Sequence, residues 1–246
     1  MDVPVLLAAG TGTALATGLG AIPVFLLGGR APTLRPAMWG FAAGSMAVVS
    51  IVGLLVPALN ESGLGEVAVG FALGVAFMLG TRRMLGARQL KVLGRQGKGV
   101  RSSALVFLVL LAHSFPEGLA IGTAYASDTA GLGLFVIVAI ALQNIPEGTS
   151  VAIPMQSAGF SRVQQFWAAV VTSAPQPIAA VAAFALVDQV DALLPLSFAF
   201  AAAAMLLLVV VELLPDALAG PRLAAGLAGT LVGAGLMIAF SAALGV

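Results

Sequence analysis

Eight apolar stretches, each long enough to cross a lipid bilayer, divide this sequence and constrain its architecture. Hydrophobic residues make up 60% of the chain and charged residues 9%, against about 25% charged in soluble domains. A helix needs about 20 apolar residues to cross a hydrocarbon core of about 30 Å. We therefore predict an all-α polytopic membrane protein that forms a single transmembrane domain over residues 1–246. The expected spans are 4–28, 36–59, 64–81, 103–125, 131–154, 163–187, 192–214 and 222–245.

The basic residues predict the orientation of these spans, because lysine and arginine accumulate in cytoplasmic loops. All 11 lie in or beside the connections that follow the first, third, fifth and seventh spans. We expect a multi-pass protein of the plasma or inner membrane with both termini outside the cytoplasm. The segment 82–102 is expected to be a basic cytoplasmic loop that contacts anionic lipid. A net charge of +1 gives no argument for nucleic-acid binding.

Two distant segments resemble each other. Residues 54–59 read LLVPAL and residues 213–218 read LLPDAL. The predicted topology gives these segments opposite directions, so spans one to three and six to eight are expected to form inverted repeats around the central pair, spans four and five. Inverted repeats are common in secondary transporters. Chance similarity between short Leu/Ala-rich segments is the alternative.

One short phrase occurs twice in the central spans, as His113-Ser114-Phe115-Pro116-Glu117-Gly118 and as Gln143-Asn144-Ile145-Pro146-Glu147-Gly148. Each copy places a candidate ligand at position i and a carboxylate at i+4, which lie on one face of a helix. An ionised carboxylate inside a membrane costs at least about 2.5 kcal/mol and needs compensation. Because the chain has no cysteine, a metal ion has only nitrogen and oxygen ligands. His113, Glu117, Gln143 and Glu147 together form a four-ligand set that suits zinc. The alternative is that His113, Gln143 and Asn144 hydrogen-bond the glutamates and only hold the two helices together.

The residues around these phrases predict their setting. Pro116 and Pro146 lack the N–H that would bond the preceding turn, so kinks are expected there. Small residues at Gly118-x-x-x-Gly122 and Gly148-x-x-x-Ala152 are expected to let helices approach closely and so bring the two phrases together. Near the end of the seventh span, Glu212 and Asp216 either receive an ion at a cytoplasmic exit, or Glu212 pairs with Arg222 or extends to water.

The sequence resembles the ZIP (Zrt/Irt-like) metal-ion permeases, in particular their GufA-like bacterial branch. The two central phrases carry the specific part of the resemblance. Supporting segments are ALATGLGA at 14–21, GFAAGSM at 40–46 and ELLPD at 212–216. The resemblance implies eight helices, a mononuclear or binuclear zinc site between the fourth and fifth spans, an elevator-like movement and a homodimer.

The resemblance also implies a primary site of His113, Glu117, Gln143 and Glu147, and a second site beside it. This chain departs from the second site twice, because Ser114 stands where the family has Asn and Gln176 where a Glu is expected. Of the residues peculiar to that second site, Asn144 is retained. We therefore predict one strong metal site, with Gln176 as a neutral neighbour.

The predicted function is a permease that moves divalent transition-metal ions into the cytoplasm. Zinc is the expected substrate, with Fe2+, Mn2+ and Cd2+ as related candidates, and no resident cofactor is expected. A proton- or organic-ion carrier that uses the intramembrane glutamates is the alternative. An intramembrane metal hydrolase is disfavoured, because such sites typically use two or three histidines and this chain has one. We expect no enzymatic activity.

Overall fold

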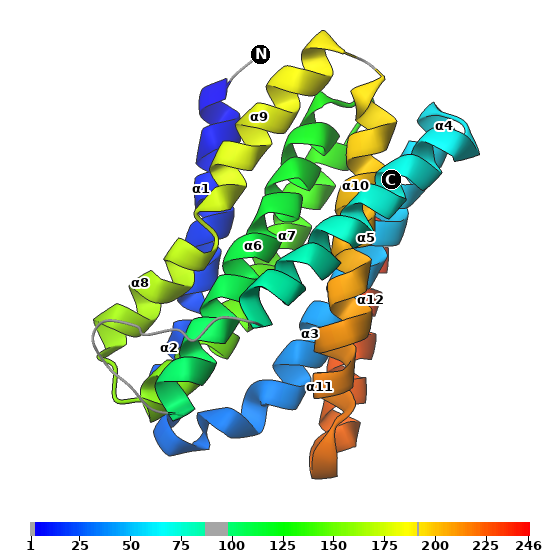
Figure 1. Ribbon diagram of the computed structural model, residues 1–246. Coiled ribbons are helices and arrows are strands. Elements are labelled where there is room, and N and C mark those ends of the chain that lie inside the picture. The colour runs from blue at the N-terminus through cyan, green and yellow to red at the C-terminus, as the bar shows by residue number, and fades with distance from the viewer. Residues whose placement is uncertain (1–2, 87–97, 191) are drawn as a thin grey trace.

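The computed structural model describes residues 3–86, 98–190 and 192–246, and all regular secondary structure within these ranges is helical (Figure 1). This agrees with the predicted all-α class. The α-helices are α1 (Val3–Leu19), α2 (Ala21–Leu27), α3 (Arg35–Val48), α4 (Val56–Glu61), α5 (Leu64–Gly86), α6 (Lys98–Ala126), α7 (Leu132–Ser157), α8 (Arg162–Thr172), α9 (Pro175–Gln189), α10 (Leu193–Leu208), α11 (Leu214–Leu218) and α12 (Leu223–Leu244). Two 3-10 helices, η1 (Gly28–Leu34) and η4 (Gly220–Arg222), and two π-helices, η2 (Val49–Leu55) and η3 (Val209–Leu213), join some of them.

Seven helical segments in the described part of the chain are long and apolar enough to cross a membrane. The first, Val3–Glu61, is 59 residues long and includes the first two predicted spans. It descends through α1 and α2 and returns through α3 and α4 (Figure 1). These segments support a multi-pass membrane protein.

The predicted loop 82–102 is too long at both ends. Helix α5 continues to Gly86 and α6 begins at Lys98, because arginine, lysine and leucine are good helix formers and a helix does not stop where its apolar part stops. The remainder of the predicted loop, residues 87–97, lies outside the described residues.

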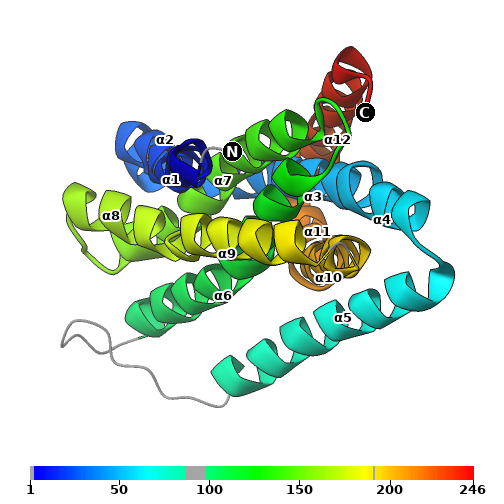
Figure 2. The ribbon, with the colours of Figure 1, turned by 90° about the horizontal axis from the view of Figure 1, so that it is seen from above.

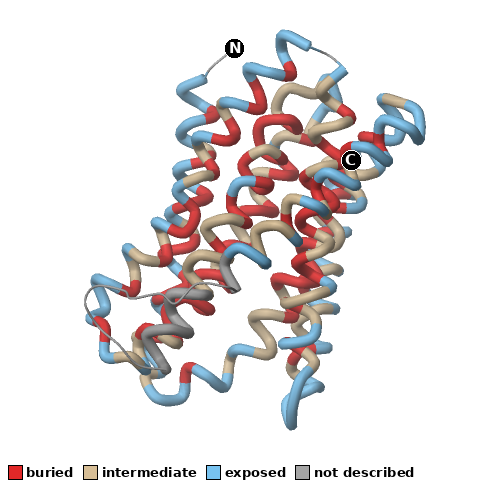
Figure 3. Tube along the Cα trace, viewed as in Figure 1, coloured by how far each residue is buried: buried red, intermediate tan, exposed pale blue. Residues whose placement is uncertain are grey.

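The helices pack as two groups (Figure 2). The first helix group consists of α1, α2 and α6–α9, in which α6 packs mainly on α9 and α1 on α7. The second helix group consists of α3–α5 and α10–α12, in which α3 packs mainly on α12 and α5 on α10. The groups meet where α10 contacts α6 and where α3 contacts α7, and Figure 3 shows buried residues along these central helices.

Glycines allow the closest helix contacts, but with other partners than predicted. A Cβ atom on Gly148 would lie 1.7 Å from the carbonyl oxygen of Thr17 in α1, and one on Gly122 would lie 2.1 Å from that of Ala180 in α9. The prediction that these glycines bring α6 and α7 together was therefore wrong in its choice of partners. The small residues allow α1 to pack closely on α7 and α9 to pack closely on α6. This packing places polar residues of α1 and α9 beside the central phrases.

Prolines mark the interruptions that shape the site. Pro175 begins α9 after a break at Ser173 and Ala174, and Gln176 in the first turn donates its backbone N–H to Ser173 O at 3.0 Å. Pro116 and Pro146 lie inside helices that continue through them. The side chain of Gln176 thus projects from the start of a helix, beside the middle of α6 and α7.

Candidate metal site

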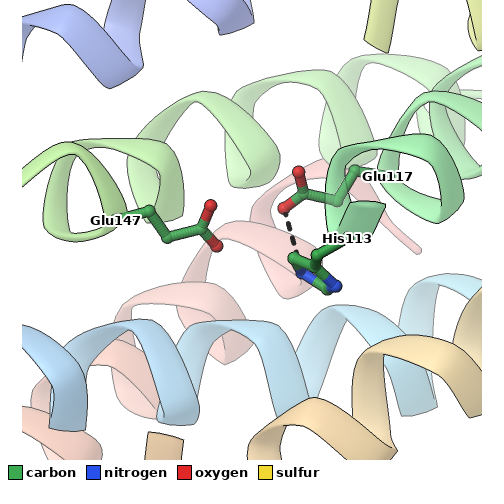
Figure 4. Close-up of side chains that lie close together, drawn as sticks. All are labelled: His113, Glu117 and Glu147. Carbon is green, nitrogen blue, oxygen red and sulfur yellow. Dashed lines mark ion pairs between the residues drawn. The ribbon is translucent and has the colours of Figure 1, made fainter. Parts of the chain in front are cut away.

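His113 and Glu117 of α6 and Glu147 of α7 lie together inside the protein (Figure 4). Their candidate ligand atoms all lie within 4.8 Å of one another. The residues are 0%, 0% and 3% exposed, respectively. His113 Nε2 lies 3.5 Å from Glu117 Oε1, as expected for side chains one helical turn apart. The i, i+4 spacing places His113 and Glu117 side by side, and Glu147 of α7 completes a buried cluster of candidate nitrogen and oxygen ligands.

Several buried polar atoms of this cluster have no hydrogen-bond partner. They are Nδ1 and Nε2 of His113, Oε1 of Gln143 and Oε1 of Glu147. A buried polar group without a partner costs about 1–3 kcal/mol, and such groups are few in native proteins and call for an explanation. Each residue among them offers an atom that can bind a metal ion. The donor set therefore fits a divalent cation held by nitrogen and oxygen.

Glu117 receives a hydrogen bond on each carboxylate oxygen. Gln143 Nε2 donates to Oε1 at 3.0 Å, and Gln176 Nε2 donates to Oε2 at 2.6 Å. Hydrogen bonds to a charged group are worth about 1.5–3 kcal/mol each. Since the Nε2 group of Gln143 is held by Glu117, its Oε1 atom is available as a ligand. Two amides thus stabilise Glu117 without cancelling its charge.

Asn144 and Gln176 do not belong to the unpartnered cluster, because their side chains bond each other and α1. Gln176 Oε1 accepts from Thr13 Oγ1 at 2.7 Å and from Asn144 Nδ2 at 3.1 Å. Asn144 Nδ2 also donates to Thr13 O at 2.8 Å. Ser114 donates to Leu110 O of its own helix. The two donors to Gln176 Oε1 fix the orientation of the amide and direct its N–H groups toward Glu117.

Thr13 is a residue of this network that the sequence reasoning did not identify. It is buried, as is Thr17 one turn later, whose hydroxyl lies 2.6 Å from that of Ser173. The signal in the sequence was the i, i+4 spacing of Thr13 and Thr17 in a mostly apolar helix, whose third threonine, Thr11, is exposed. The alternative in which His113, Gln143 and Asn144 all bond the glutamates holds only for Gln143.

A cavity of about 320 Å³ extends from Glu147 to the end of the bundle at which α11 lies. Two ion pairs of the second helix group line it. Arg82 Nε lies 3.0 Å from Glu212 Oε1, and an Arg35 nitrogen lies 2.6 Å from Asp216 Oδ2. Of the two alternatives for Glu212, the proposed pairing with Arg222 is not what the structure has, because Arg82 is the partner.

Comparisons with known proteins give one consistent result. The family model described as the ZIP zinc transporter matches residues 92–241. The chain is 32% identical over 213 residues to the zinc transporter GufA of Myxococcus xanthus, which covers 82% of this chain and 84% of GufA. It is 31% identical over 246 residues to the zinc transporter ZIPB of Bordetella bronchiseptica, which covers 94% of this chain and 78% of ZIPB.

A candidate zinc transporter of Arabidopsis thaliana is 36% identical over 207 residues, which cover 83% of this chain but only 33% of the plant protein. The two bacterial relatives match over most of their length as well as most of this chain. These matches confirm the resemblance seen in the two central phrases, and the chain belongs to the ZIP zinc transporter family.

Proposed function

We propose that this protein carries divalent transition-metal ions, above all zinc, across the membrane into the cytoplasm, and that His113, Glu117, Gln143 and Glu147 bind the ion during transport. The observation that carries the proposal is the buried cluster of unpartnered atoms on three of these residues, beside the charged Glu117. Two carboxylates balance one divalent ion, and a histidine nitrogen and an amide oxygen complete a four-coordinate shell. No enzymatic step is proposed.

The site is proposed to hold one ion. Asn144 and Gln176 occupy the neighbouring position and contribute amides, whose polar atoms bond Thr13, Glu117 and each other. An added divalent ion at that position lacks a carboxylate of its own. We expect purified protein to retain about one tightly bound zinc ion per chain in equilibrium dialysis. Two equal high-affinity ions would contradict this.

Eight spans with both termini outside the cytoplasm are proposed. The segment Val3–Glu61 would measure about 88 Å as one straight helix at 1.5 Å per residue, so two crossings account for it better than one. The connections that contain arginine or adjoin it, from α2 to α3, before α8 and from α11 to α12, lie at one end of the bundle (Figure 1). The α4–α5, α6–α7 and α9–α10 connections lie at the other end. By the positive-inside rule the first end faces the cytoplasm.

The inverted repeats remain a proposal with one new supporting feature. The similar segments at 54–59 and 213–218 each place a proline, Pro57 and Pro215, in the first turn of a helix that follows a π-helix. Helices containing these segments run in opposite directions (Figure 1). A backbone irregularity that is rare thus occurs at the same place in both candidate repeats.

An elevator-like movement is proposed for transport. The ligands His113, Glu117, Gln143 and Glu147 all belong to the first helix group, whereas the two ion pairs of the cavity belong to the second. The helices pack more closely within each group than between the two groups. This difference favours a movement in which one helix group slides past the other. A homodimer, implied by the family resemblance, is proposed to keep the second group fixed in the membrane.

The test is uptake of radioactive zinc into sealed proteoliposomes. Glu147→Gln keeps the shape of the side chain but removes one of the two charges that balance the ion, so uptake is expected to be lost. Glu66→Gln is the matched control, because Glu66 is exposed near the opposite end of the bundle. Unchanged zinc flux in Glu147→Gln would remove the site assignment, and metal-independent transport would favour the proton- or organic-ion carrier. Competition by Fe2+, Mn2+ and Cd2+ in the same assay ranks the substrates.

A further inference from the structure

Arginine side chains of the protein balance the acidic residues at the bundle end of the cavity beside Glu147. Both of its acidic residues near the bundle end are paired with arginine, Glu212 with Arg82 and Asp216 with Arg35. Glu147 also lines this cavity, is 3% exposed and has an unpartnered Oε1 atom. An ion that leaves the buried site through the cavity therefore meets carboxylates that are already neutralised by the protein.

We propose that Arg82 determines which cations bind in the exit cavity. By pairing with the Glu212 carboxylate, Arg82 prevents monovalent cations from binding there. A divalent ion, in contrast, can displace Arg82 from Glu212. The proposal rests on the proposed function, since it assigns a role on the path that the transported ion takes. It makes Arg82 a residue that determines cation specificity at the cavity and not a ligand of the transport site.

The physical basis is competition for one carboxylate. A divalent ion has about twice the Coulomb attraction of a guanidinium group at the same distance. A potassium ion has the same charge as Arg82, but it lacks the directed N–H groups that a guanidinium offers a carboxylate. The tethered arginine is thus able to exclude potassium, although it yields to zinc.

The exposure of the pair permits this exchange. The Arg82 side chain is 37% exposed and that of Glu212 is 21% exposed, so a displaced guanidinium can extend into water without being buried unpaired. Arg35 is less suited to the role, because its guanidinium also stacks on the ring of Trp39 at 4.9 Å. Asp216, its partner, is 46% exposed and lies one turn beyond Glu212.

The experiment compares Arg82→Gln with Arg83→Gln in proteoliposomes. Arg83 is the adjacent residue of α5, carries the same charge, is exposed and does not line the cavity. Zinc uptake is measured with potassium, or with the bulky cation N-methylglucamine, on the cytoplasmic side. We expect wild type and Arg83→Gln to be insensitive to this exchange. For Arg82→Gln, potassium is expected to slow uptake about two- to fivefold, the factor that corresponds to a partly exposed ion pair.

Two further variants test whether the effect comes from the Arg82–Glu212 pair. Arg82→Lys keeps a tethered cation with N–H donors but not the guanidinium geometry, and should restore part of the insensitivity to potassium. Zinc titration of purified Arg82→Gln should reveal an additional weak site that disappears in Arg82→Gln/Glu212→Gln. If Arg82→Gln behaves like Arg83→Gln in both the flux and the titration, the proposal is wrong. A different result would contradict the proposed transport site itself, namely normal zinc uptake by the Glu147→Gln variant.

Discussion

Changing Gln176 to Glu replaces the Nε2 amino group by oxygen and leaves the shape of the side chain nearly unaltered. In the wild type, the Gln176 Nε2 group donates to Glu117 Oε2 at 2.6 Å, while Oε1 accepts from Thr13 and Asn144. Both of those donors remain in the variant and keep one oxygen of the new carboxylate in place. The other oxygen then faces Glu117 where a donor used to be.

The energetic cost of this contact is large. Loss of the charge-assisted hydrogen bond costs about 1.5–3 kcal/mol. Two unit charges 2.6 Å apart, the present donor–acceptor distance, repel by about 6 kcal/mol at an effective dielectric constant of about 20. The sum is comparable with the whole stability of a typical domain, about 5–15 kcal/mol. The variant must therefore take up a proton or a cation between the two carboxylates.

We predict that Gln176→Glu binds about two zinc ions per chain where the wild type binds about one. Equilibrium dialysis of detergent-purified protein against radioactive zinc counts the ions. In the presence of a chelator, the thermal unfolding midpoint of the variant should fall below that of the wild type, and added zinc should raise it more.

Two controls separate the effect of position from that of charge. Gln189→Glu adds the same charge at the exposed end of α9 and should change neither quantity. Gln176→Leu removes the amide without adding a ligand and should not gain an ion. If Gln176→Glu keeps one zinc ion and an unchanged midpoint in chelator, the reasoning about charge at this position fails.

Two other perturbations test the packing and the hydrogen bonds around the site. Gly148→Ala places a methyl group 1.7 Å from Thr17 O, so the free energy of unfolding, measured by thermal denaturation, should fall by about 1–3 kcal/mol or more. The control variant Gly235→Ala places its methyl group in open space and should leave the free energy of unfolding unchanged or slightly raised. Thr13→Val removes a donor to Gln176 Oε1 and lets the amide rotate, so the zinc concentration for half-maximal uptake should rise, and Thr13→Ser, which keeps the hydroxyl, should restore it. Equal behaviour of the members of either pair would contradict the corresponding prediction.

The all-helical class and the positions of the long apolar helices were largely predictable, because the length of apolar sequence needed to cross lipid is fixed by physics. The predicted span 131–154 corresponds to α7, Leu132–Ser157, and the predicted span 192–214 corresponds to α10, η3 and the start of α11. The ends of helices were less predictable where charged residues follow an apolar segment. Helix α5 passes Arg82 and Arg83 to Gly86, since hydropathy marks the part of a helix that meets lipid and not its last hydrogen bond.

The pairing of His113 with Glu117 on one face of α6 was predictable from spacing, because i and i+4 share a helix face in any α-helix. The surroundings were not, because the choice of neighbouring helices depends on packing between distant segments. Glycines of α6 and α7 contact α9 and α1, and for this reason Thr13 and Gln176 approach Glu117. The duplicated motif in the sequence indicated the candidate ligands but not the amide and hydroxyl groups of Gln176 and Thr13 beside them.

The two charged regions of the protein are compensated in different ways, and the difference suits a transporter. At the buried site, the described side chains that donate to Glu117 are amides, so under the proposed function the transported ion would balance the carboxylate charge. At the cavity, Arg82 and Arg35 cancel the charges of Glu212 and Asp216 directly. A fixed cation at the buried site would compete permanently with the substrate, whereas two uncompensated carboxylates along the exit would retain it. Affinity for a divalent ion should therefore decrease from Glu147 toward Asp216, which allows an ion to bind tightly and still leave.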